Sequence, residues 1–100
     1  MSLRIELDRE RIAEFCLRNH IVRLSLFGSV LREDFSPDSD VDVLVQFAPG
    51  AVVTLLDMVT MEDELAEMIG RKVDLRTPED LSRYFRANVL ATAVVQYAAA

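Results

Sequence analysis

The sequence has little of what marks several common classes of protein. A single cysteine, Cys16, stands among 100 residues, which excludes a disulfide within the chain. No block of lysine and arginine is present and the net charge is −6, which argues against non-specific nucleic-acid binding because such binding needs a basic surface. No signal peptide is visible, and the longest apolar run is far shorter than the ~20 residues of a membrane span, so we expect a cytoplasmic protein with no membrane association.

Two scarce residues have structural interpretations. The only histidine, His20, follows Asn19 near an expected helix end, where the helix dipole favours a cation. We therefore expect a structural rather than a catalytic histidine. Cys16 has the spacing of one helix face with Ile12 and Phe15, which favours an inert core thiol over a reactive one.

Apolar periodicity and capping residues predict an alternation of helices and strands. Asp8 is a helix cap, Thr54 with Asp57 is a capping box, Gly70 is a helix stop, and Thr77-Pro78 opens a last helix that carries Leu81. The segment 93–97 suits either a fourth strand or a helix end. We expect helices over 8–18 and 54–70 and from 78 onward, and strands over 21–27, 40–47 and 72–76.

These elements predict one domain over residues 1–100 with an α+β fold in two layers. A long helix joins the second and third strands, which implies a parallel, right-handed crossover. The first two strands pair antiparallel if the motifs at their ends are to meet. The predicted sheet is therefore small and mixed, in the order 1-2-3, with helices packed largely on one face and an open polar face.

A glycine and two carboxylates stand at the ends of the first two predicted strands. Gly28 permits a tight turn and close approach of a ligand to the backbone. A helix that starts at Ser29 has free N–H groups that favour an anion, and Arg32 follows one turn later, within reach of the same phosphates. Asp40 and Asp42 share a strand face, where two like charges repel unless a cation lies between them.

The residue types suit a magnesium–triphosphate site, because Mg²⁺ takes one or two carboxylates together with substrate phosphates. Asp74 lies on the polar face of a short strand, where a third carboxylate can join the metal site. The plainer interpretation also stands, since Asp-x-Asp and Gly-Ser are common in solvated turns and a lone strand aspartate is usually only exposed.

Three motifs together resemble the minimal nucleotidyltransferase family (MNT) of the DNA polymerase β-like nucleotidyltransferase superfamily. They are Gly-Ser-x-x-Arg at 28–32, Pro-Asp-Ser-Asp-x-Asp at 37–42 and Val-Asp-Leu at 73–75. The resemblance implies that Gly28 and Ser29, with Arg32, bind the triphosphate, that Asp40 and Asp42 bind Mg²⁺, and that Asp74 is the third acid, which helps to hold metal and to activate the attacking hydroxyl.

The chain departs from the family pattern in its loop. Val30 stands where many relatives have arginine, and Glu33 stands where glycine is frequent. One positive phosphate contact is therefore missing, whereas all three acids are present.

The resemblance also implies a reaction and a partner. The family transfers a nucleotide, typically AMP from ATP with two Mg²⁺ ions, to a hydroxyl, and its members often accompany HEPN proteins in toxin–antitoxin pairs. We therefore expect an antitoxin that modifies a hydroxyl of a HEPN-type toxin. The alternatives are an antitoxin or binding module that acts by contact with weak or no catalysis and, with less support, an aminoglycoside-type transferase. Four apolar residues suit a partner or homo-oligomer surface, although the core is their commoner place: Val52, Val53, Met58 and Met61.

Overall fold

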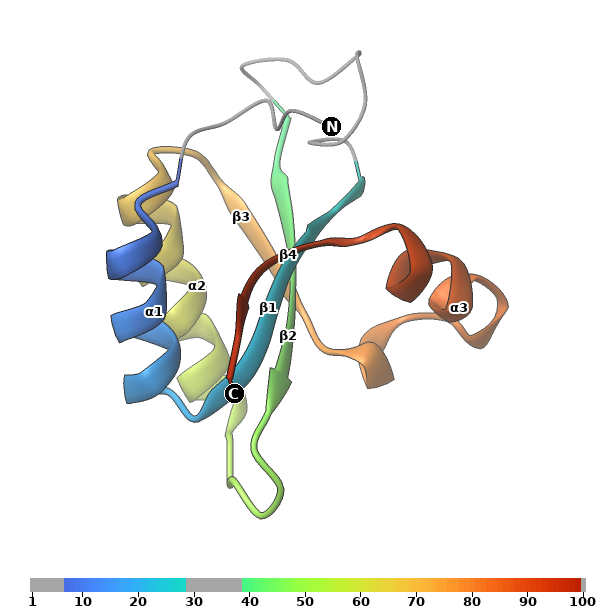
Figure 1. Ribbon diagram of the computed structural model, residues 1–100, viewed down its shortest axis with the longest axis horizontal. Helices are drawn as coiled ribbons and strands as arrows, with labels where there is room; N and C mark the ends of the chain where they lie inside the picture. Colours follow the sequence, from blue (N-terminus) through green and yellow to red (C-terminus); the bar gives the residue numbers. More distant parts are fainter. Residues whose placement is uncertain (1–6, 29–38, 100) are drawn as a thin grey trace.

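The computed structural model describes residues 7–28 and 39–99. Helices and strands alternate along most of the chain, with a short 3₁₀ turn, η2, before the last helix (Figure 1). The elements are α1 (Arg9–Arg18), β1 (Ile21–Phe27), β2 (Val41–Phe47), α2 (Leu55–Ile69), β3 (Val73–Arg76), η2 (Pro78–Asp80), α3 (Arg83–Thr92) and β4 (Val94–Ala98).

The strands form one mixed sheet in the order β3-β2-β1-β4. β1 pairs antiparallel with β2, and β2 pairs parallel with β3, so the predicted α+β fold and the predicted order of the first three strands are confirmed. The predicted sheet lacked one strand. The ambiguous C-terminal segment is β4, which pairs antiparallel with β1 and places Val94 beside Leu26 and Tyr97 beside Leu24.

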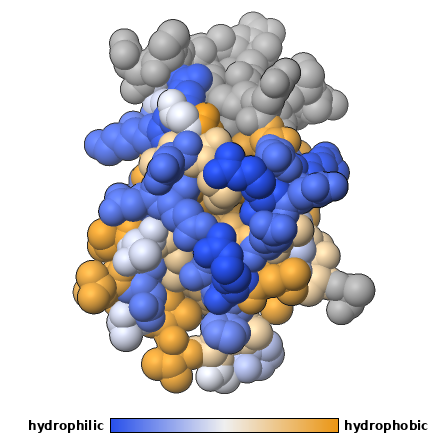
Figure 2. All heavy atoms as spheres, turned by 90° about the vertical axis from the view of Figure 1, so that its left-hand side faces the viewer, coloured by the Kyte–Doolittle hydropathy of each residue, from blue (hydrophilic) through white to orange (hydrophobic). Residues whose placement is uncertain are grey.

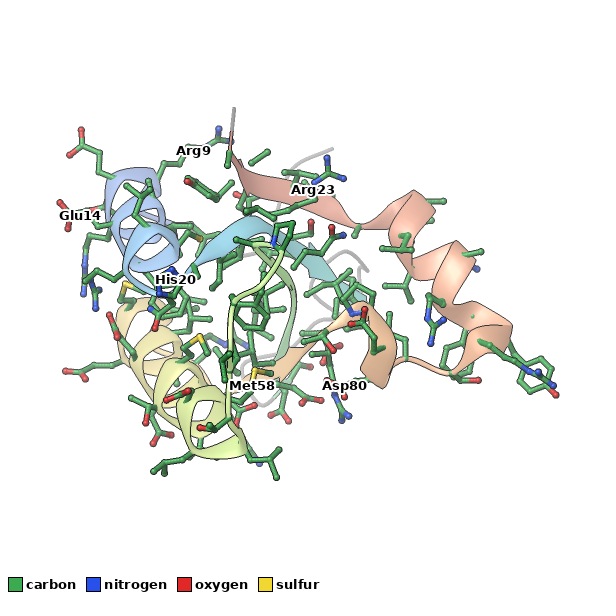
Figure 3. The ribbon with its side chains drawn as sticks, turned by 90° about the horizontal axis from the view of Figure 1, so that it is seen from below. Arg9, Glu14, His20, Arg23, Met58 and Asp80 are labelled. Atoms are coloured by element: carbon green, nitrogen blue, oxygen red, sulfur yellow. The ribbon has the colours of Figure 1, made fainter. Side chains whose placement is uncertain are left out.

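Helices α1 and α2 lie together on one side of the sheet, and α3 lies on the other side (Figures 1 and 3). The core fills the space between the sheet and the first two helices. From β2, alternate residues Val41, Val43 and Val45 are completely buried in this core, and Phe15 of α1 and Leu65 of α2 are buried with them. The alternation turns Asp42 to the opposite face, away from the two helices.

The first two helices begin and end where their capping residues predict. An oxygen of the Asp8 carboxylate accepts hydrogen bonds from the N–H groups of Glu10 and Arg11 at 3.1 and 3.2 Å. Thr54 and Asp57 exchange the two hydrogen bonds of a capping box at 3.0 and 3.1 Å. Gly70 ends α2 with a left-handed backbone, at φ +76°.

The last helix begins later than the sequence predicts. Thr77-Pro78 opens only the turn η2, after which Leu81 adopts an extended backbone and packs inward with 8% of its surface exposed. Arg86 ties α3 to this turn, because its guanidinium donates to the carbonyl oxygens of Pro78 at 2.7 Å and Leu81 at 3.0 Å. No residue of α3 is buried, which leaves this helix only loosely packed.

Cys16 has the core position predicted for it, and His20 follows the end of α1 as predicted, while its structural role stays a prediction. Cys16 is fully buried, and this burial raises the pKa of its thiol to about 12, so the thiol stays neutral and unreactive at pH 7. His20 is exposed in the turn after α1 and has φ +59°, while its carbonyl oxygen accepts from the N–H of Ala48 at 2.8 Å. Across residues 7–28 and 39–99, none of the helices has the length and apolar character to cross a membrane.

The four apolar residues proposed for a partner surface have different places. Met61 is buried, and Val53 and Met58 pack against the core, whereas Val52 is 87% exposed. The outer face of α1 and α2 is largely hydrophilic, with hydrophobic atoms gathered toward its lower end (Figure 2). The β2–α2 connection lies at that end in Figure 1.

The capping box gives a test of how α2 is stabilised. Thr54→Ala removes the hydroxyl that accepts from the Asp57 N–H, and we expect a loss of about 1 kcal/mol in the free energy of unfolding. Thr60→Ala is the matched control, because Thr60 lies inside the same helix and is also exposed. Urea unfolding followed by circular dichroism measures both, and equal stabilities of the two variants would contradict the capping role.

Candidate active site

The pairing of three strands brings Asp42 and Asp74 together. Asp42 of β2 has a partner on each side. Phe27, at the end of β1, is opposite Asp42 in the antiparallel pair, and Asp74 is opposite Asp42 in the parallel pair with β3. Next to this position, the Val41 N–H donates to the Lys72 carbonyl oxygen at 2.8 Å and fixes the start of β2 against β3. Neighbouring strands lie about 4.8 Å apart, so the two carboxylates project from adjacent positions of one face.

Gly28 lies directly against the carboxylate of Asp42. Its φ is +75°, a left-handed backbone that glycine adopts without cost. A Cβ atom at this position would lie 2.2 Å from Oδ2 of Asp42, closer than any side chain tolerates. The turn after β1 therefore needs glycine both for its conformation and for its contact with the acid.

Asp74 forms an ion pair with Arg76 on the same face of β3. The Arg76 Nε lies 3.1 Å from Oδ1 of Asp74, and Nη2 donates to Oδ2 at 3.2 Å, so the pair is bidentate. The pKa of Arg76 is raised, first by the hydrogen bond and charge of Asp74 and then by the charges of Asp80 and Asp42. The spacing Asp74-Leu75-Arg76 contains the signal for this pair, because strand residues two apart share a face.

The donor atoms at this position fit a hard divalent cation. Asp42 and Asp74 supply carboxylate oxygens, Asp40 stands two residues before Asp42, and Gly28 places no side chain against the Asp42 oxygen. Within the described part of the chain, however, no group of three acidic, histidine or cysteine side chains is already gathered for a metal ion. Asp42 and Asp74 are thus neighbours rather than parts of a preformed cage, and the role of Asp40, Asp42 and Asp74 as metal ligands stays a prediction.

Two predicted phosphate-binding residues, Ser29 and Arg32, lie outside the described residues, as do the two departures from the family pattern, Val30 and Glu33. Of the predicted triphosphate cradle, the structure places Gly28 alone.

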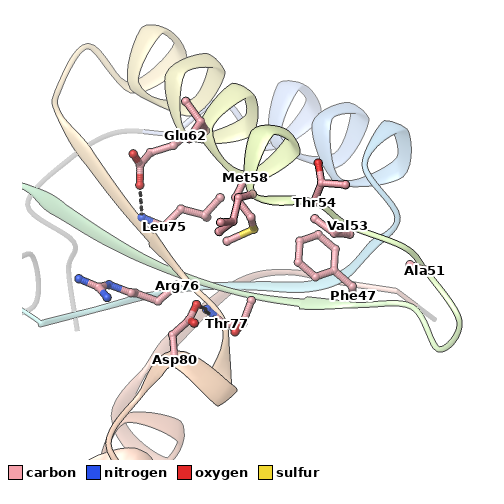
Figure 4. A pocket seen from close by; sticks show the side chains of 12 residues that line it. Phe47, Ala51, Val53, Thr54, Met58, Glu62, Leu75, Arg76, Thr77 and Asp80 are labelled. Atoms are coloured by element: carbon pink, nitrogen blue, oxygen red, sulfur yellow. Dashed lines mark hydrogen bonds between the residues drawn. The ribbon is translucent and has the colours of Figure 1, made fainter.

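A groove with a volume of about 520 Å³ lies between α2 and the ends of β2 and β3. Phe47, Val53 and Met58 form an apolar part of its lining, and Arg76 extends away from them (Figure 4). Glu62 accepts a hydrogen bond from the Leu75 N–H at 2.9 Å. This bond satisfies a backbone donor of the edge strand β3. No sequence pattern identifies this groove, because its walls come from three separated segments.

Gly28→Ala tests the contact between the turn and Asp42. We expect a loss of stability larger than the roughly 1–2 kcal/mol cost of a left-handed alanine, because the new Cβ collides with the carboxylate. Gly50→Ala is the control, since Gly50 has φ +85° and a Cβ atom added there would meet nothing within 4 Å. Denaturant unfolding compares the two variants. If they lose the same stability, the collision with Asp42 does not matter.

The comparisons with known proteins identify the family of this chain. The model of a family described as a nucleotidyltransferase domain matches residues 9–95, which include Gly28, Asp42 and Asp74. A protein of Methanocaldococcus jannaschii, named as a candidate protein adenylyltransferase, is 34% identical over 86 residues, which are 86% of this chain and 90% of its own length. Protein adenylyltransferase MntA of Thermococcus cleftensis is 34% identical over 71% of this chain and 70% of its own length.

Solved structures show the same fold. One described as a candidate minimal nucleotidyltransferase is 37% identical, covers 86% of each chain and has a TM-score of 0.71. The MNT antitoxin in complex with a tri-AMPylated HEPN toxin of Shewanella oneidensis matches with a TM-score of 0.65 over 90% of this chain and 69% of the matched chain, but with 18% identity it supports the fold alone. By family model, sequence identity and fold together, the chain belongs to the nucleotidyltransferase domain family.

Proposed function

We propose that the chain transfers AMP from ATP to a hydroxyl group of a partner protein, and that this partner is a HEPN-type toxin for which the chain is the antitoxin. One observation supports the proposed AMP transfer. Asp42 and Asp74 lie side by side on β2 and β3, and Gly28 packs against the Asp42 oxygen at the end of β1. Two adjacent carboxylates beside a glycine turn suit a metal-bound triphosphate.

In this proposal the acids and the turn have separate roles. Asp40, Asp42 and Asp74 hold Mg²⁺, which supplies positive charge against the phosphate oxygens when it is bound. Gly28, with Ser29 and Arg32, holds the β- and γ-phosphates that leave. Asp42 and Gly28 touch each other, so the chain fixes the acids and the phosphate-binding turn relative to one another.

The reaction needs one bond made and one bond broken at the α-phosphorus. The oxygen of the acceptor hydroxyl bonds to this phosphorus while the bond to the bridging oxygen breaks, and pyrophosphate leaves. The hydroxyl loses its proton in the same step. Asp74 serves here either by holding metal or by taking this proton, and in both roles its carboxylate oxygens, which now pair with Arg76, take on a new partner.

The names of similar proteins support the choice of nucleotide and acceptor. Two relatives at 34% identity are named as protein adenylyltransferases, which means AMP transfer to protein. One structure with the same fold is an MNT antitoxin in complex with an AMPylated HEPN toxin. Together these names favour AMP as the group transferred and a protein hydroxyl as its acceptor.

Asp74→Ala tests the chemical role of the third acid. We expect AMP transfer to fall by about 10²–10⁴-fold, the usual contribution of general acid–base assistance, while much of the ATP affinity remains because Asp40 and Asp42 still bind the nucleotide's metal. Transfer of radiolabelled AMP from ATP to a co-purified HEPN protein measures the rate, and calorimetry measures ATP binding in the presence of Mg²⁺.

Two further variants serve as a control for Asp74→Ala and as a test of the metal site. Asp63→Ala, at an exposed acid of α2, should transfer AMP like the wild type. Asp42→Asn should lose Mg²⁺-dependent ATP binding and still fold. A variant at Asp74 that transfers AMP at the wild-type rate would rule out the role of this residue, and wild-type ATP binding by Asp42→Asn would rule out the site.

A second candidate function is neutralisation of the toxin by contact, and one surface favours it. Large apolar side chains are exposed at the start of α2, where Leu55 is 85% and Leu56 is 74% exposed, next to Val52 and Val59. Leu55 and Val59 also line the groove between α2 and β3. Contiguous exposed apolar residues of this kind mark protein-binding surfaces.

The double variant Leu55→Ser with Leu56→Ser separates the two functions. Both side chains are exposed, so we expect the fold and ATP binding to persist, and the affinity for the HEPN protein to fall at least tenfold if this surface binds it. Leu17→Ser, at a 70% exposed position of α1, is the control. Toxin neutralisation that survives Asp74→Ala and fails in the double variant would establish contact as the mechanism.

A further inference from the structure

The carboxylate of Asp74 already has a cation beside it. Arg76 meets both of its oxygens, at 3.1 and 3.2 Å, in a bidentate geometry that orients the carboxylate. The two side chains are only partly buried, with 38% of Asp74 and 47% of Arg76 exposed. The guanidinium therefore has room to move without opening the core.

Arg76 also lies in the field of two other carboxylates. The charges of Asp80 and Asp42 add to that of Asp74 in raising its pKa. Arg76 stays protonated near pH 7, so at this pH the pair is broken by movement of the side chain and not by loss of the arginine proton. Its positive charge offsets the repulsion between the adjacent carboxylates on β2 and β3.

We propose that Arg76 is the resident counter-ion of Asp74, which must withdraw before a divalent cation binds there, and that it thereby sets the metal affinity of the site. The inference rests on the proposed role of Asp42 and Asp74 as metal ligands. It assigns Arg76 a positioning role, because this residue acts on the metal through Asp74.

Arg76 and the metal ion compete for Asp74, and this competition would link metal binding to nucleotide binding. A metal ion alone must displace the guanidinium from Asp74 and leave two cations close together, which is unfavourable. A triphosphate supplies new negative charge within the same site, and arginine binds phosphate as well as carboxylate. The metal ion at Asp74 is then bound weakly until the nucleotide also binds.

Arg76→Gln tests this competition in the full-length chain without nucleotide. Mn²⁺ binding, followed by the loss of its free electron paramagnetic resonance signal, gives the metal affinity, and competition with Mg²⁺ gives the affinity for magnesium. We expect Arg76→Gln to bind Mn²⁺ about two- to fivefold more tightly than the wild type, a size that suits a partly exposed ion pair. Arg76→Lys should lie between them, because lysine keeps the charge and loses the bidentate geometry.

Arg18→Gln is the matched control. Arg18 also forms a double hydrogen bond with a carboxylate, that of Glu64, but it joins α1 to α2 on the covered side of the sheet. Arg18→Gln changes the net charge by the same amount as Arg76→Gln and also removes one ion pair. We expect it to leave the affinity for Mn²⁺ unchanged. The gain in Arg76→Gln should also disappear in the Asp74→Asn background, since the two residues act through one contact.

The outcomes separate this inference from the proposed function. An affinity in Arg76→Gln equal to or weaker than that of the wild type overturns the inference, even if its thermal stability falls as for any lost structural pair. Absence of Mn²⁺ binding in both proteins overturns the inference together with the metal site. A tighter site in a chain that transfers no AMP to any partner supports the inference and counts against the proposed reaction alone.

Discussion

The parallel pairing of β2 with β3 is the contact on which the rest of the structure depends. It places Asp42 beside Asp74, and it requires a connection long enough to return the chain to the same end of the sheet. That connection is α2, which begins at the Thr54 capping box and ends at Gly70. Because α2 also buries Leu65 against the sheet, the same crossover forms the core and aligns the two acids.

This alignment imposes a steric constraint at Gly28 and an electrostatic cost that Arg76 reduces. Adjacent carboxylates on paired strands repel, and only Gly28 is small enough to let the Asp42 oxygen lie against the turn after β1. On the other side, Arg76 neutralises Asp74. The two acids thus differ in their surroundings, since one faces a backbone turn and the other a guanidinium. Two acids of the same type therefore have different surroundings because of Gly28 and Arg76.

Much of this arrangement follows from the sequence, because the local signals are strong. Alternation in β2 and β3 and the caps of α1 and α2 predicted those elements to within one or two residues. The start of α3 and the identity of β4 were not decided by local pattern. α3 begins late because Arg86 binds the carbonyls of Pro78 and Leu81, and 94–98 becomes a strand because β1 has a free edge. Both depend on contacts between separated segments, which periodicity does not report.

The candidate chemistry and the apolar groove meet at β3. Leu75 turns inward to the groove, where Glu62 holds its backbone N–H, while Asp74 lies on the side of the acids. Arg76 belongs to both, since it lines the groove and binds Asp74. Leu55 and Val59, near the start of α2, line the same groove as Arg76, so a protein bound there would share this groove with the partner of Asp74. If both proposed functions hold, contact and catalysis are coupled through Arg76, because this one residue of a four-residue edge strand lines the groove and pairs with Asp74.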